Sequence, residues 1–181
     1  MKQESKPAFS YPVKVGHISA NPVTVHMSAN DVELRALAEL WRVEGVSSLA
    51  ADLQIARWKK DGVKIKGEVR AHIVQSCVVT LEPVESDIRE PVDAILVPEG
   101  SRLARQADGG EMIVDPDGPD LPDTFTGDTI DAGVVVSEHV ALAIDPYPRK
   151  PGAAFGERIE SSAADDERPN PFAVLKDWKK D

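Results

Sequence analysis

The clearest alternation of apolar and polar residues in the chain runs from Val63 to Ile73. Small or apolar residues occupy every second position, and the positions between them carry Lys64, Lys66, Glu68, Arg70 and His72. A period of two residues predicts a strand with one buried face and one face in water. The alternation stops at an apolar stretch around Cys77 and resumes over residues 84–97. We therefore predict two long strands joined by a corner that contains Cys77.

A third strand is predicted over residues 49–58, where the alternation is weaker. The sequence Lys60-Asp61-Gly62 separates it from the strand at 63–75. Asp-Gly is a strong signal for a two-residue hairpin turn, because a type I′ turn requires positive φ. We expect strand 63–75 to pair with strand 49–58 on one side and with strand 84–97 on the other. The three strands would then form an antiparallel meander.

Two short strands and a helix are predicted closer to the N-terminus. Phe9–Val15 has the pattern of a strand that Pro12 interrupts, which suits the edge of a sheet, and Val23–Met27 is the second strand. A helix over residues 31–43 is indicated by an apolar stripe with a period of 3.6 residues, formed by Leu34, Leu37, Ala38 and Trp41.

The helix at 31–43 has two possible caps at its start. Asn30 with Glu33 and Ser28 with Asp31 both have the spacing of a capping box, and the sequence does not choose between them. Gly45 is well placed to end the helix.

The segment Ile130–Ile144 is apolar except for Ser137, Glu138 and His139. Its three consecutive valines favour a strand, whereas its length, its polar start and the following Asp145-Pro146 favour a helix. We predict a helix over 130–144. The fold class is then α+β, with an antiparallel sheet of about five strands covered by helices 31–43 and 130–144.

Charge is unevenly distributed along the 181 residues, which carry a net charge of -10. Residues 98–131 hold nine acidic and two basic residues, whereas residues 1–97 are almost neutral. Because residues 98–127 are also rich in Asp, Gly and Pro, we predict a flexible acidic loop there. Residues 1–150 are expected to form a single α+β domain. Residues 151–181 are expected to form a disordered tether and a C-terminal helix with the sequence NPFAVL.

Several functional classes lack support in the sequence. A single cysteine excludes an intrachain disulfide and a multi-cysteine metal site, and the four histidines have no metal-binding spacing. The acidic loop does not fit the spacing of a calcium-binding EF-hand. The N-terminus has no apolar run, and no segment is apolar over about 18 residues, so we expect neither a signal peptide nor a membrane span. We predict a cytoplasmic protein with no catalytic residue, no metal and no cofactor.

A cluster of basic residues around the predicted hairpin is the most informative polar feature. We expect RNA phosphates to contact Lys59, Lys60, Lys64, Lys66 and Arg70. The alternative is that these residues form an ordinary solvated strand face without a ligand. Glu68 on the same face favours this alternative. Aromatic residues on which bases could stack are missing from that row.

The C-terminal segment follows the predicted tether and has the pattern of a short helix. Asn170 is a suitable N-cap and Pro171 a suitable first residue, and Phe172, Leu175 and Trp178 recur every three residues. These residues are candidates for binding a partner. The segment could equally dock onto the sheet of its own chain, and nothing in the sequence separates the two possibilities.

Three separated motifs occur in a characteristic order, with the acidic loop before the second. They are Cys77-Val78-Val79-Thr80-Leu81-Glu82-Pro83, Gly127-Asp128-Thr129-Ile130-Asp131 and Asn170-Pro171-Phe172-Ala173-Val174-Leu175. Together they resemble the large ribosomal RNA subunit accumulation protein family, which comprises YceD-like bacterial proteins and chloroplast relatives. The resemblance extends roughly over residues 9–178.

The resemblance implies a role in the synthesis, processing or stability of 23S ribosomal RNA. The family has no established catalytic residues, so none is transferred to this chain. Many relatives carry a second cysteine three positions after the first, where this chain has Thr80. This difference removes a metal-binding or redox role for the pair and leaves Cys77, Leu81 and Pro83 as a motif that we interpret as structural. The resemblance also implies a helix over 130–144.

We therefore predict a non-enzymatic adaptor that supports accumulation of large-subunit ribosomal RNA. The basic hairpin would contact ribosomal RNA or its precursors, and the acidic loop would attract a basic ribosomal protein or processing factor. One alternative is a magnesium-dependent RNA-processing enzyme, which would cleave precursor RNA and needs acids on a rigid scaffold. Another is an adaptor that binds proteins without touching RNA.

Overall fold

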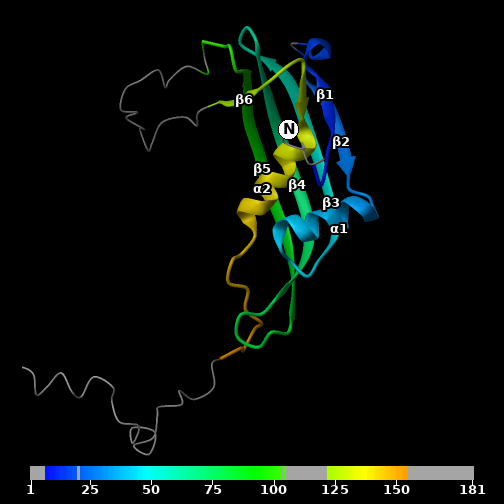
Figure 1. Cartoon of the computed structure of the whole chain (residues 1–181), viewed down its shortest axis with the longest axis vertical. Helices are drawn as coiled ribbons and strands as arrows, with labels where there is room; N and C mark the ends of the chain where they lie inside the picture. Colours follow the sequence, from blue (N-terminus) through cyan, green and yellow to red (C-terminus); the bar gives the residue numbers. More distant parts are fainter. Residues whose placement is uncertain (1–6, 20, 103, 105–121, 155–181) are drawn as a thin grey trace, which may run out of the picture. The chain divides into compact units, whose positions relative to one another are not determined.

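Three long strands form the centre of the fold (Figure 1). They are β3 (Gly45–Trp58), β4 (Gly62–Ser76) and β5 (Pro83–Pro98), and β4 pairs antiparallel with both neighbours. The predicted meander is therefore confirmed. The structure is a computed structural model that describes residues 7–19, 21–102, 104 and 122–154. The chain divides into two units, Met1–Lys150 and Pro151–Asp181, and every helix and strand described here belongs to the first.

Two further strands extend the sheet to the order β2-β3-β4-β5-β6. Strand β2 (Val23–Ser28) lies antiparallel to β3, as its sequence predicts. Strand β6 (Asp123–Phe125) lies parallel to β5, although we had placed these residues in the acidic loop. Residues 105–121 of that loop are outside the described residues. The α+β class with a five-stranded sheet is confirmed.

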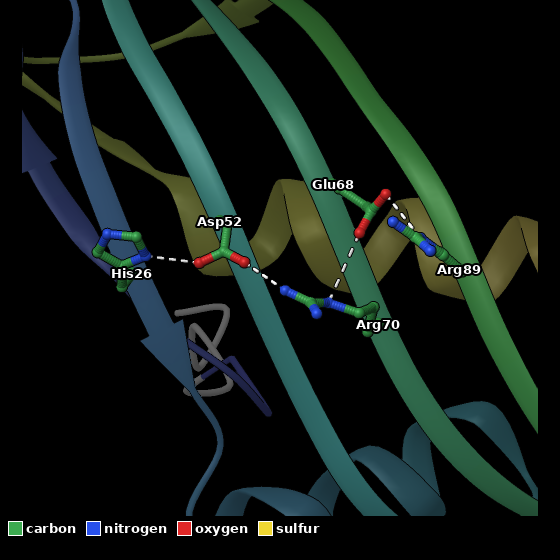
Figure 2. A network of polar contacts seen from close by, with 5 residues as sticks. All are labelled: His26, Asp52, Glu68, Arg70 and Arg89. Carbon is green, nitrogen blue, oxygen red and sulfur yellow. Dashed lines mark hydrogen bonds and ion pairs between the residues drawn. The ribbon is translucent and has the colours of Figure 1, made fainter.

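The sheet has one covered face and one open face. On β4 the side chains of Val63, Ile65, Val69 and Ile73 are buried in the core, and their neighbours in sequence point to the other side. Helix α1 (Asp31–Trp41) packs against β3, and helix α2 (Ala132–Ala143) packs against β4 and β5. Both helices lie on the same side of the sheet (Figures 1 and 2). The alternation of the sequence therefore separates an apolar face under the helices from a polar face without helices.

A glycine at the centre of β4 allows the central strands to approach closely. A Cβ atom at Gly67 would lie 2.1 Å from the backbone oxygen of Asp52 on β3. No side chain fits at that distance, so this position requires glycine.

Helix α1 begins and ends with defined caps. Asn30 accepts hydrogen bonds from the backbone N–H groups of Val32 and Glu33, and Glu33 accepts one from the Asn30 N–H. This capping box decides between the two alternatives in the sequence. The prediction that Gly45 ends the helix was wrong. Arg42 itself adopts the left-handed conformation at the C-cap, with φ of 56°, and Gly45 begins β3.

The turn between β3 and β4 differs from the predicted Asp61-Gly62 type I′ turn. Trp58 pairs with Gly62, so the loop contains three residues, and the positive φ of 52° belongs to Lys59. Gly62 is required within the strand instead, because a Cβ atom there would lie 2.8 Å from Cε3 of Trp58.

The predicted strand over Phe9–Val15 is shorter than expected. Strand β1 (Pro12–Lys14) is followed by the short 3₁₀ helix η1 (Val15–His17) and pairs with β7 (Thr129–Asp131) in a separate two-stranded sheet. Because 129–131 is extended, the predicted helix over 130–144 begins two residues late. The Asp131 carboxylate caps α2 by accepting from the N–H groups of Gly133 and Val134.

Candidate nucleic-acid interface

All five predicted RNA-contact residues lie on the hairpin formed by β3 and β4. Lys59 and Lys60 lie in its three-residue turn, which we call the tip together with Arg57 and Trp58. Lys64, Lys66 and Arg70 lie on β4, on the polar face that the helices leave uncovered, which we call the open face. The structure therefore separates the predicted cluster into two groups with different surroundings.

On the open face, the two lysines share one carboxylate from the neighbouring strand. The Lys64 and Lys66 ammonium groups lie 3.3 and 3.2 Å from the Asp93 carboxylate of β5. Burial raises the pKa of Asp93, but the hydrogen bonds from Lys66 and Lys64 outweigh it and lower the pKa overall. Asp93 is therefore ionised at neutral pH and neutralises part of the charge of this lysine pair.

Arg70 belongs to a network that crosses four strands (Figure 2). The Asp52 carboxylate of β3 lies between His26 of β2, at 2.5 Å, and the Arg70 guanidinium of β4. Glu68 contacts Arg70 at 3.6 Å and Arg89 of β5 at 2.7 Å. The hydrogen bonds from His26 and then Arg70 lower the pKa of Asp52. Carboxylates and arginines therefore alternate along this network, from Asp52 to Arg89, and His26 lies at its end.

A third group of ion pairs on the open face involves His72. His72 of β4 lies 2.8 Å from Asp87 and 3.8 Å from Glu85, both on β5. The hydrogen bond to Asp87 raises the pKa of His72. Four lysines and arginines of this face form ion pairs: Lys64, Lys66, Arg70 and Arg89. Five carboxylates pair with them or with His72: Asp52, Glu68, Glu85, Asp87 and Asp93. This face has no excess of positive charge.

The tip has a different electrostatic character. Arg57, Lys59 and Lys60 are exposed, and within the described part of the chain none of them forms an ion pair with a carboxylate. Lys59 Nζ lies over the indole ring of Trp58, 4.1 Å from its centroid. Asp61 is the acidic residue in the turn itself. Within residues 57–61 three cations therefore outnumber one carboxylate.

Asp52, Asp93 and Glu68 neutralise the cations of the open face. The sequence places Glu68 on this face, but Asp52 and Asp93 lie on other strands and are distant in sequence from their partners. Only the register between the strands reveals these two pairings. Trp58 was also overlooked as an aromatic residue beside the cations, although it directly precedes Lys59.

The corner that joins β4 to β5 lies at the opposite end of β4 from the tip (Figure 1). Cys77 is fully buried, and its Sγ accepts a hydrogen bond of 3.4 Å from the backbone N–H of Lys150. Hydrogen bonds from the Thr80 hydroxyl and then from the Lys150 N–H lower the pKa of the thiol to about 6. Leu81 is exposed and has a φ of 59°, and Pro83 begins β5. The motif therefore shapes a turn, in which hydrogen bonds to the Cys77 sulfur favour the ionised form of the thiol.

Two other predicted binding segments are outside the described residues. These are the C-terminal candidates Asn170, Pro171, Phe172, Leu175 and Trp178, and residues 105–121 of the acidic loop. Among the residues that the structure does describe, no group of three or more His, Cys, Asp or Glu side chains is arranged to hold a metal ion. Within the same residues, no helix has the length and apolar character that crossing a membrane requires.

Comparison with known proteins identifies the family. The model of the family described as large ribosomal RNA subunit accumulation protein YceD matches residues 65–179, which is more than half of the chain. Neither a curated protein nor a solved structure matches the chain. The family is named for accumulation of ribosomal RNA and not for an enzymatic reaction. This match confirms the resemblance seen in the three sequence motifs, and the chain belongs to the YceD family of large ribosomal RNA subunit accumulation proteins.

Proposed function

We propose that the protein is a non-enzymatic, cytoplasmic factor that binds ribosomal RNA or its precursors and so supports accumulation of the large-subunit RNA. In this proposal the tip of the β3–β4 hairpin contacts RNA phosphates. One observation carries the proposal: the tip cations lack carboxylate partners within the described residues, whereas those of the open face are paired. The family name supplies the link to ribosomal RNA.

The physical reason is that a cation binds phosphate best when no other anion already holds it. Lys64 and Lys66 would have to leave Asp93 before they contact RNA, and Arg70 would have to leave Asp52. Lys59 and Lys60 need to break no ion pair with any residue that the structure describes. Each phosphate that they neutralise releases counterions from the RNA, which favours binding at low salt.

The net charge of -10 constrains how this contact forms. The whole molecule repels RNA at long range, so affinity must come from short-range contacts at a local positive patch. A Debye length of about 8 Å at physiological salt limits the repulsion from distant carboxylates. The tip lies before residue 65, where the family match begins, so this contact is proposed for this chain and not for the family.

The proposal retains a second, protein-binding role for the adaptor. The acidic segment over residues 98–127 would attract a basic ribosomal protein or processing factor through its charge. The residues Asn170, Pro171, Phe172, Leu175 and Trp178 would add an apolar contact with a partner. Deletion of residues 108–120, which leaves β6 intact, should weaken co-purification of ribosomal proteins, and unchanged co-purification would remove the acidic segment from the proposal.

Two double variants of equal charge test the RNA contact. Lys59→Gln/Lys60→Gln removes two charges from the tip, and Lys64→Gln/Lys66→Gln removes two from the open face. Binding of the full chain to a fragment of 23S precursor RNA is measured by fluorescence anisotropy at several salt concentrations. We expect the tip variant to lose about tenfold in affinity and its salt slope to fall by about 1.4, from two lost phosphate contacts. The open-face variant should lose less than about threefold.

Three results would contradict the proposal. Equal losses in the two variants would mean that the tip has no special role. A wild-type protein that binds no RNA would favour the adaptor that contacts proteins alone. Cleavage of the RNA by the purified protein in the presence of magnesium would favour the enzyme. Circular dichroism spectra of both variants should match the wild type, because exposed ion pairs contribute only about 0.2–1 kcal/mol to stability.

A further inference from the structure

The tip carries one large aromatic side chain among its cations. Trp58 is the last residue of β3, and its indole ring lies at the point where the strands end and the exposed turn begins. The residue is partly exposed. Aromatic rings beside cations are the usual means by which proteins bind unpaired nucleotides, because every base has a face that can stack.

The Trp58 ring lies next to the opposite strand and to the following lysine. Gly62, its cross-strand partner, lies so close that a Cβ atom there would be 2.8 Å from the ring atom Cε3. The ammonium of Lys59 lies over a face of the ring, 4.1 Å from the centroid. An exposed lysine side chain therefore covers that face in the free protein.

We propose that the Lys59 side of Trp58 is a stacking site for an unpaired nucleobase, and that the protein therefore binds single-stranded RNA in preference to duplex RNA. This inference rests on the proposed function, since it assumes that RNA binds at the tip. Lys59 lies over the ring, and Arg57 and Lys60 are within two residues of Trp58 in sequence, so these three residues would supply cations for the phosphates next to the stacked base.

A nucleobase can replace the Lys59 ammonium over the Trp58 ring. An exposed cation–π contact is weaker than a stacked base, and the lysine can rotate away without breaking an ion pair with any described residue. Once displaced, its ammonium is close to the ribose-phosphate backbone of the incoming nucleotide. The same lysine that covers the ring in the free protein then binds phosphate in the complex.

The stacking geometry explains the preference for single strands. Bases in an A-form duplex are already stacked on their neighbours, and their faces are inaccessible to a side chain. A loop, bulge or single-stranded end exposes them. A purely electrostatic tip would bind duplex and single strand through phosphates alone and would not distinguish them by base stacking.

The alternative is that Trp58 only closes the end of the hairpin. A structural role of this kind makes the fold, and not the RNA affinity, sensitive to substitution. Trp58→Phe keeps a stacking ring, and Trp58→Leu keeps an apolar side chain without one. Tyr147→Leu is the matched control, since Tyr147 is an exposed aromatic residue in the segment that follows α2.

The experiment measures affinity of the full chain for two probes by fluorescence anisotropy. The probes are an oligouridine of about 15 nucleotides, which is long enough to fill a single-strand binding site, and an RNA duplex of the same length. We expect Trp58→Leu to weaken oligouridine binding by about tenfold, Trp58→Phe to weaken it by less than about threefold, and Tyr147→Leu to leave it unchanged. Duplex affinity should change by less than about twofold in all three variants. Melting temperatures identify any variant that is unfolded.

Two failures are distinguishable. If the wild type binds RNA with a salt slope that depends on Lys59 and Lys60, but Trp58→Leu binds oligouridine as the wild type does, the stacking site is refuted and the proposed function stands. An equal loss for single strand and duplex in Trp58→Leu refutes it as well. If the wild type binds neither probe, both proposals fail.

Discussion

The tip and the open face of the β3–β4 hairpin carry the same types of basic residue in different surroundings. On the open face, Lys64 and Lys66 share Asp93, whereas Lys59 and Lys60 lie in the turn and form no ion pair with any residue that the structure describes. Within a sheet each side chain has a cross-strand neighbour on both sides, and an opposite charge there neutralises it. A turn residue has no such neighbours. The position of a cation in the hairpin therefore decides whether its charge is available to a ligand.

The largest expected effect comes from Gly67, on which both regions depend. Gly67→Ala would place a Cβ atom 2.1 Å from the Asp52 backbone oxygen, so β3 and β4 must separate. We expect a loss of about 3 kcal/mol in the free energy of unfolding, measured by urea denaturation. Gly45→Ala is the control, because nothing lies within 4 Å of a Cβ atom there. Equal stability of the two variants would show that the close approach of the strands is not required.

Releasing the open-face lysines should make that face resemble the tip. In Asp93→Asn, Lys64 and Lys66 lose their shared carboxylate, and RNA affinity should rise by about threefold to tenfold with a steeper salt dependence. Asp87→Asn removes the same charge from the open face without releasing a lysine, because Asp87 pairs with His72. If both variants gain equally, overall charge and not the availability of lysines controls binding.

The Cys77 thiol provides a pH-dependent test, because hydrogen-bond donors lower its pKa. With a pKa of about 6, its thiolate absorbance near 240 nm should appear on raising the pH through about 6 in the folded protein. Because the folded pKa lies below the reference value of 9.0, its contribution to stability is fully present above pH 9 and is lost as pH falls through 6. Thr80→Val should shift the midpoint upward, since the Thr80 hydroxyl is the main cause. An unchanged midpoint would contradict this assignment.

The smallest effect is expected at His72, whose charge depends on pH. The hydrogen bond to Asp87 raises its pKa, so the protonated form stabilises the fold. This contribution is fully present below the unfolded pKa of 6.5 and is lost as pH rises through the higher folded value. His72→Gln should therefore lower the melting temperature slightly at pH 5.5 and leave it unchanged at pH 8.5. A larger effect at pH 8.5 would contradict the ion pair.

The sequence predicted which side chains share a face but not which of them pair. Alternation over residues 63–73 placed Lys64, Lys66 and Arg70 together correctly, because that pattern depends on one strand alone. Pairing depends on register, and register depends on the turn. A two-residue turn at Asp61-Gly62 would have placed Asp52 opposite Ala71, whereas the three-residue loop places it opposite Glu68 and beside Arg70.

Tertiary contacts explain the other differences between the sequence and the fold. Thr129–Asp131 is extended because it pairs with β1, and the local apolar pattern contains no trace of that pairing. Strand β6 is three residues long and is stabilised by parallel pairing with β5, so neither its length nor its composition indicates a strand. The corner at Cys77 is likewise completed by Pro148 and Lys150, which are more than 70 residues away in sequence.

Ultraviolet crosslinking in cells that express the full chain tests the central claim most directly. Direct contact between the tip and ribosomal RNA should leave a nucleotide adduct on the peptide that contains Trp58, Lys59 and Lys60, identified by mass spectrometry. The crosslinked RNA should map to the large-subunit ribosomal RNA or its precursor. Adducts confined to peptides of the open face, between Lys64 and Arg89, or the absence of any adduct on this protein, would contradict the claim.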